Sequence, residues 1–245
     1  MQTADLLHQR YLNTLESIVG FSRKHQRSND SVRLVAVSKR HPAWKIFELA
    51  RAGQIDFAEN YLQEALEKIN EVNEICESEG VESPLQWHFI GHIQSRKCRE
   101  IAENFDWVHT VESRKVANKL NQHRTAGKPL NVLIQLNLQE ESTKSGILPV
   151  DLEPLARHIA SLKNLKLRGL MIIPKNEPDF EEQRAVFRQC RENLETLNQN
   201  GFELDQLSMG MSGDLEAAIA EGATQVRIGT AIFGPRPDRA PRPGT

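Results

Sequence analysis

A lysine stands directly after one of the most apolar stretches of the chain. Lys39 follows the run Leu-Val-Ala-Val-Ser at residues 34–38. An amine at the end of a buried strand loses hydration, which lowers its pKa, and the neutral amine is the form that condenses with an aldehyde. Lys39 is therefore a candidate for Schiff-base chemistry, although its position alone favours an ordinary surface lysine paired with a carboxylate or with solvent.

Two segments rich in glycine and hydroxyl residues could bind an anion near the end of the chain. They are SMGMSGD at 208–214 and RIGTAIFG at 227–234. Glycines let the backbone approach a phosphate closely, and a helix expected to start near Gly213 would direct its free N–H groups to the same place. Either segment alone suits an ordinary turn or helix cap. The two together favour a phosphate site.

An arginine lies inside the last apolar run of the chain. Arg227 occurs in the segment QVRIG, where a charged side chain is costly unless it is paired or faces a polar cavity. An exposed strand edge or an ion pair inside the fold would explain it. So would a ring nitrogen of a bound cofactor, because a neighbouring cation keeps such a nitrogen unprotonated and weakens the ring as an electron sink.

Alternating patterns predict the elements that must position these residues. Helical periodicity opens the chain, and eight strand candidates follow, each next to a helix: 33–39, 55–60, 87–92, 107–111, 130–138, 165–173, 203–210 and 225–233. Strict alternation predicts parallel strands with right-handed crossovers, and eight units in this length favour a closed barrel. We expect one α/β domain over residues 1–235, a (β/α)8 TIM-type barrel with an extra N-terminal helix. A proline-rich tail without regular structure is expected over residues 236–245.

The composition excludes several classes of function. A net charge of -2 gives no electrostatic case for nucleic acid binding, and no apolar run approaches the roughly 20 residues of a membrane span. The N-terminus lacks the pattern of a signal peptide. The three cysteines are far apart, with neither metal-ligand spacing nor a disulfide framework. We expect a cytoplasmic protein without a metal site.

Several motifs occur together in a characteristic order. They are VAVSK at 35–39, AEN at 58–60, WHFIGHIQSRK at 87–97, STKSGI at 142–147, GLM at 169–171, LSMGMSGDLEAAI at 207–219 and VRIGTAIFG at 226–234. In these motifs the chain resembles the YggS/PROSC-type pyridoxal 5'-phosphate (PLP) homeostasis proteins over residues 5–235. That family is a single-domain relative of the barrel half of alanine racemase, with a fold-type III PLP-binding barrel. Arg40 and Ala58 depart from the threonine and glycine that are frequent there.

The resemblance implies a role for each candidate residue. It implies that Lys39 forms the internal Schiff base with PLP and that Arg227 faces the pyridine nitrogen. Six further residues are implied to contact the cofactor, the first four at its phosphate: Ser208, Ser212, Gly229, Thr230, Asn60 and Met171. Lys144, in the STKSGI motif, is a candidate second contact, although an ordinary loop lysine is the commoner explanation.

The resemblance favours a cofactor binder over an enzyme. Racemases of this fold use a barrel lysine and a tyrosine from a second domain, and we expect that domain to be absent. The two tyrosines, Tyr11 and Tyr61, are expected in the core and at a helix start. The implied function is reversible PLP binding, buffering and delivery to PLP-dependent apo-enzymes by a monomer. A weak amino-acid racemase is the alternative, and a sugar-phosphate aldolase with Lys39 as its Schiff-base lysine is a third.

Overall fold

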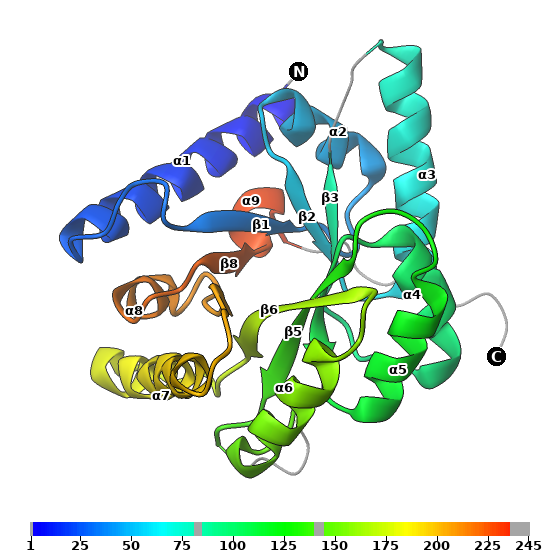
Figure 1. Cartoon of the computed structure of the whole chain (residues 1–245). Coiled ribbons are helices and arrows are strands. Elements are labelled where there is room, and N and C mark those ends of the chain that lie inside the picture. The colour runs from blue at the N-terminus through cyan, green and yellow to red at the C-terminus, as the bar shows by residue number, and fades with distance from the viewer. Residues whose placement is uncertain (1, 81–84, 140–144, 236–245) are drawn as a thin grey trace, which may run out of the picture.

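A closed barrel of eight parallel strands forms the centre of the protein. The computed structural model describes residues 2–80, 85–139 and 145–235, and Figure 1 shows its course. The strands pair in chain order, and β8 closes on β1. Their bounds are β1 Arg33–Val37, β2 Asp56–Glu59, β3 Gln86–Phe89, β4 Trp107–Val111, β5 Leu130–Leu136, β6 Leu165–Ile172, β7 Gln206–Ser208 and β8 Gln225–Ile228. The predicted (β/α)8 barrel is confirmed. The predicted tail and Lys144 lie outside the described residues.

Helices surround the barrel as the alternation predicts. The helices are α1 Gln2–Lys24, α2 Ala43–Arg51, α3 Leu62–Ser78, α4 Cys98–Asn104, α5 Arg114–His123, α6 Leu152–Ala160, α7 Phe180–Gln199, α8 Leu215–Ala220 and α9 Thr230–Phe233, with 3-10 turns η1 Ser95–Lys97 and η2 Pro149–Asp151. Capping side chains determine where two of these helices begin. Ser113 accepts a hydrogen bond from the Val116 backbone N–H at the start of α5, and Asp179 caps α7 in the same way.

The N-terminal helix takes the place of the eighth outer helix. α9, which follows β8, has only four residues, so it cannot cover the strand by itself. α1 packs against α2, α8 and α9, and Figure 1 shows it along β1 and β8. The helix described above as extra is therefore part of the ring. It buries Leu7, Tyr11 and Ile18 and leaves Leu12 half exposed.

The structure corrects two element boundaries in the final third of the chain. The run 225–233 is not one strand, because β8 ends at Ile228 and residues 230–233 form α9. Ile232 and Phe233 are buried as helical residues, and a short apolar run does not distinguish a buried strand from a buried helix. The helix expected near Gly213 begins at Leu215 and has six residues.

The strands have two buried faces with different contents. On β1, Leu34 and Ala36 belong to the main hydrophobic core with the surrounding helices, whereas Val35 and Val37 form a separate small cluster with Ala58. Because successive side chains of a strand point to opposite faces, the second set lines the inside of the barrel. The continuous apolar runs of the sequence reflect burial on both faces.

A row of polar side chains crosses the inside of the barrel. Asp56 Oδ1 lies 2.9 Å from His88 Nε2, and His88 Nδ1 lies 2.9 Å from His109 Nε2. His109 Nδ1 lies 2.9 Å from Ser208 Oγ, which accepts a 2.7 Å hydrogen bond from Arg227. We call these five residues the interior chain. Barrel interiors are usually packed with branched apolar side chains, so this row indicates a function beyond packing.

Burial controls the protonation of the two histidines in the interior chain. Both rings are fully buried. Burial lowers the pKa of His88 below 6.5, and the hydrogen bond to Asp56 opposes that effect. Burial lowers the pKa of His109 further, and the neighbouring His88 and Arg227 act in the same direction. Both rings are therefore neutral at pH 7.

No helix in the described parts of the chain is both long enough and apolar enough to cross a membrane. Within the same residues, no three His, Cys, Asp or Glu side chains gather in a way that could hold a metal ion.

Replacing Tyr11 by alanine tests the role of α1 in the ring. Tyr11 is 4% exposed and Leu12 is 51% exposed on the same helix. We expect Tyr11→Ala to lower the free energy of unfolding by about 3 kcal/mol, the usual cost of truncating a buried aromatic ring. Leu12→Ala is the matched control and should change it by less than about 0.5 kcal/mol. Equal effects in denaturant titrations would contradict the placement of α1.

The lowered pKa values of His88 and His109 predict a loss of stability in acid. Below their ordinary pKa of 6.5 the unfolded chain takes up protons that the folded rings do not bind. The free energy of unfolding should therefore fall with decreasing pH, by up to about 1.4 kcal/mol per pH unit for each ring. Denaturant titrations between about pH 7 and pH 5 measure this slope. His109→Gln should reduce the slope, because it removes one of the two buried rings whose pKa is lowered in the folded state.

Candidate functional site

A cavity of about 310 Å³ lies at the carboxyl ends of β1, β2 and β8. This is the end of a (β/α)8 barrel at which binding sites occur. Six of the eight residues predicted from the sequence line it: Lys39, Asn60, Ser212, Arg227, Gly229 and Thr230. Segments that are far apart in the sequence thus meet around one space.

The strand pattern explains why Lys39 and Asn60 reach the cavity. Lys39 comes two residues after the inward-facing Val37, and Asn60 comes two residues after the inward-facing Ala58. Each therefore continues the inner face of its strand. Gly91 allows the end of β3 to approach, because a Cβ atom there would lie 2.0 Å from the Asn60 carbonyl oxygen.

A buried ionic cluster holds the backbone next to Lys39. Lys68 Nζ donates to the Ser38 carbonyl and to Glu59 Oε1, each at 2.7 Å, and Ser38 Oγ donates to the same carboxylate oxygen at 2.7 Å. Burial raises the pKa of Glu59, and Lys68 opposes that rise. Sequence reasoning missed Lys68. The available signal was a lysine three residues from Ala65 and four from Val72, on the buried face of α3.

The residues after Lys39 pack against neighbouring elements. The Arg40 backbone N–H donates to Glu64 Oε1, and its φ is 64°. His41 is buried and stacks on Phe233, with ring centroids 5.1 Å apart. His41 still forms part of the cavity wall, where its ring packs between the cavity and α9.

Arg227 reaches the cavity from inside the barrel. It is 4% exposed, and its guanidinium donates to Ser208 Oγ at 2.7 Å and to the Ile172 carbonyl at 2.8 Å. Burial lowers the pKa of Arg227 to about 10, and the Asp214 carboxylate opposes that lowering. The guanidinium is therefore a fixed positive charge at neutral pH in the floor of the cavity.

Two loops form the part of the wall that suits an anion. Ser212 and Gly213 come from the β7–α8 loop, and Gly229 and Thr230 come from the end of β8. Both loops combine exposed backbone with hydroxyl groups. α8 is too short for its dipole to contribute much, and its N-cap is Asp214, not Ser212 or Gly213. Anion binding here would rest on N–H and hydroxyl groups of the loops.

Two predicted residues lie deeper in the barrel and do not line the cavity. Ser208 is level with Gln225, two residues below Arg227, and Met171 is level with Ser208. Both are fully buried. The Ser208 hydroxyl is hydrogen-bonded to His109 and Arg227, whereas Met171 packs in a cluster with Trp107 and Leu133. Both side chains point into the barrel, but they lie at a level further from its mouth than the residues that line the cavity.

A second cavity continues across the mouth of the barrel toward β3–β6. It has about 300 Å³ and shares Asn60, Ile90 and Ile173 with the first. Three polar residues at or just after the ends of strands line it: His92, Thr110 and Asn137. The two cavities are therefore neighbours at the mouth of the barrel, and Lys39 and Arg227 line only the first of them.

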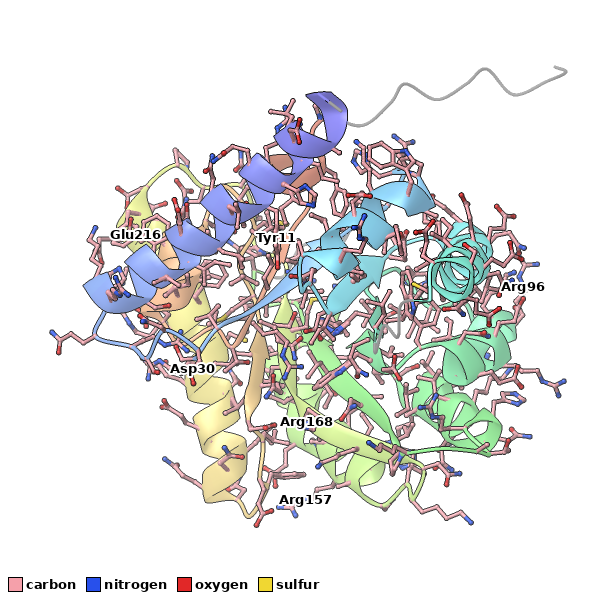
Figure 2. All side chains as sticks on the ribbon, turned by 90° about the horizontal axis from the view of Figure 1, so that it is seen from above. Tyr11, Asp30, Arg96, Arg157, Arg168 and Glu216 are labelled. Carbon is pink, nitrogen blue, oxygen red and sulfur yellow. The ribbon has the colours of Figure 1, made fainter. Side chains whose placement is uncertain are left out.

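Neither tyrosine lines these cavities. Tyr11 is buried against the barrel under α1, as Figure 2 shows. Tyr61 is 48% exposed at the start of α3. Both lie where the sequence predicted them, in the core and at a helix start.

Comparisons with known proteins agree with this geometry. The sequence matches the profile of the alanine racemase N-terminal domain over residues 21–237. It is 52% identical over 216 residues to the pyridoxal phosphate homeostasis protein of Pseudomonas aeruginosa, which covers 88% of this chain and 89% of that protein. The protein of the same name from Escherichia coli K12 is 49% identical over 211 residues, 86% of this chain and 88% of that one.

Solved structures place the fold in the same group. PipY of Synechococcus elongatus, solved with PLP bound, superposes with a TM-score of 0.77 at 36% identity, over 89% of this chain and all of PipY. Alanine racemase of Bacillus anthracis shares the fold at 18% identity, with a TM-score of 0.66 over 98% of this chain and 58% of that one. The chain thus belongs to the alanine racemase N-terminal domain family and, within it, to the pyridoxal phosphate homeostasis proteins.

Proposed function

We propose that this protein binds PLP on Lys39 and serves intracellular PLP homeostasis by holding, buffering and delivering the cofactor. One observation carries the proposal: Lys39, the buried cation of Arg227 and the two hydroxyl-rich loops all line one cavity. These are the groups that an aldehyde, a pyridine nitrogen and a phosphate require. PipY, a relative with 36% identity, has been solved with PLP bound.

The cavity has features that fit such a ligand. Its volume of about 310 Å³ is in the range of small-molecule sites. The Asn60 side-chain oxygen is buried in its wall and has no hydrogen-bond partner in the described residues. A buried polar atom without a partner is costly, so a ligand donor at this position would stabilise the wall.

Each cavity residue has a role in the proposal. When bound, PLP supplies an aldehyde that condenses with an amine and releases water. Lys39 supplies that amine from the rim of β1. Ser212, Gly229 and Thr230 hold the phosphate through hydroxyl and backbone N–H groups, and Arg227 faces the ring nitrogen. Asn60 orients the ring from the side of β2.

The same arrangement favours a carrier over a catalyst. A cation beside the ring nitrogen opposes protonation of that nitrogen, so the ring withdraws electrons weakly. Racemisation also needs a second base opposite the lysine, and neither Tyr11 nor Tyr61 lines the cavity. The proposed carrier acts as a cytoplasmic monomer and passes PLP to apo-enzymes.

Substitution of Lys39 tests the attachment site. After incubation with PLP, borohydride reduction and peptide mass mapping, we expect an adduct on Lys39 in the wild type and none in Lys39→Ala. Lys166→Ala is the matched control, because Lys166 is an exposed lysine at the other end of a strand and should keep the adduct. Both variants should unfold at the wild-type temperature.

Two results would contradict the assignment. An adduct that persists at full yield on Lys144 in Lys39→Ala would move the attachment to the STKSGI motif. A wild-type protein that forms no adduct with PLP but forms one with a sugar phosphate would favour the aldolase alternative.

Isotope exchange separates a carrier from a racemase. In heavy water with PLP and each common amino acid, we expect the wild-type protein to introduce no deuterium at the α-carbon, because the cation of Arg227 weakens the ring as an electron sink. Proton NMR of the amino acid measures the exchange. Exchange that depends on Lys39 would instead favour the weak racemase.

A further inference from the structure

The interior chain has a single pattern of donors and acceptors when its histidines are neutral. Asp56, as a carboxylate, only accepts, so His88 Nε2 carries the proton that points to it. His88 Nδ1 then accepts from His109 Nε2–H, and His109 Nδ1 accepts from the Ser208 hydroxyl. The Ser208 oxygen finally accepts from Arg227. Every donation in the row runs from Arg227 toward Asp56.

The surrounding residues hold this pattern in place. The Trp107 ring stacks on His88 at 5.5 Å and 3°, and neither histidine ring is exposed to solvent. The charged groups that act on His88 are Asp56, Arg33 and Asp106. Besides His88, the group that acts on the pKa of His109 is Arg227. Arg33 lies 3.5 Å from Asp56 and is exposed, so the row spans the barrel from its amino-terminal end to the cavity.

The pattern determines what Ser208 and Arg227 can bind. The Ser208 hydrogen is used by His109, which leaves none to donate to a phosphate. Two of the five guanidinium N–H groups of Arg227 are used by Ser208 and by the Ile172 carbonyl. Arg227 is also one of the residues that line the cavity.

We propose that His88, His109 and Ser208 are positioning residues that fix the guanidinium of Arg227 through one directed row of hydrogen bonds ending at Asp56. The role assigned to Ser208 thus differs from the phosphate contact implied by family resemblance. The identity of the ligand rests on the proposed PLP function. The row itself is a property of the protein without ligand.

The protonation of the two rings tests the row directly. In protein with 15N-labelled histidine and no PLP, long-range proton–nitrogen NMR spectra identify the tautomer of each ring, with assignments from single histidine substitutions. We expect His88 and His109 to be neutral Nε2–H tautomers at neutral pH. An Nδ1–H tautomer or an imidazolium at His109 would overturn the proposal, whether or not the protein binds PLP.

Two variants outside the cavity test the effect on binding. Ser208→Ala removes one hydrogen-bond partner from His109 and one from Arg227, and we expect the Kd for PLP to rise about tenfold. Asp56→Asn removes the terminal carboxylate, and we expect a smaller rise together with loss of the fixed His88 tautomer. In both variants the borohydride adduct should stay on Lys39, because the row positions Arg227 and does not supply the amine.

Ser22→Ala is the matched control for these variants. Ser22 is also a fully buried serine, but its hydroxyl has no hydrogen-bond partner in the described residues and it lies on α1, outside the barrel. We expect unchanged Kd and unchanged histidine spectra. Wild-type affinity in folded Ser208→Ala, or an equal loss in Ser22→Ala, would refute a specific role for the row. If Ser208→Ala does not fold, the tautomers of His88 and His109 in the wild-type protein still test the proposal.

Discussion

The site is organised around a positive charge buried inside the barrel. A guanidinium in this environment is costly unless its N–H groups are hydrogen-bonded, and removing a partner from such a group is more costly still. Arg227 obtains its partners from Ser208 on β7 and from the carbonyl of Ile172 on β6. Burial lowers the pKa of Arg227 to about 10, and the Asp214 carboxylate opposes that lowering. From Ser208 the row of hydrogen-bonded side chains continues through His109 and His88 to Asp56.

The fold separates stability from function by using the two faces of each strand. The outward side chains pack with the helices into the main hydrophobic core, whereas the inward ones form two small apolar clusters with the interior chain beside them. Lys39 and Arg227 lie on inward faces, and Val35 pairs with Arg227 across the β1–β8 seam. Because α1 covers this seam from outside, the chain can turn at Gly229 without a full helix after β8. That turn places Gly229 and Thr230 at the rim beside Lys39.

Much of this could be predicted from residue patterns, and the failures have physical causes. The barrel, the position of Lys39 at a strand end and the pairing of two loops near the last strands follow from local periodicity and turn residues. The strand predicted at 225–233 was too long, because buried helices and buried strands share apolar runs. Lys68 was missed because two of its partners, Ser38 and Glu59, are on other elements, and only Glu64 lies one turn away on the same helix. An ion pair between two elements cannot be recognised from local sequence patterns, because it forms only when those elements pack together.

The sequence by itself determined the order of the elements, the face of each strand on which a residue lies, and hence the set of side chains that point into the barrel. The tertiary structure decided how deep each of them lies. Ser208 and Arg227 share an inward face, yet the register places Ser208 below the cavity and Arg227 in its wall. The five members of the interior chain come from five strands spread over residues 56–227. Barrel closure alone brings them within hydrogen-bond distance, because register and closure depend on all eight strands at once.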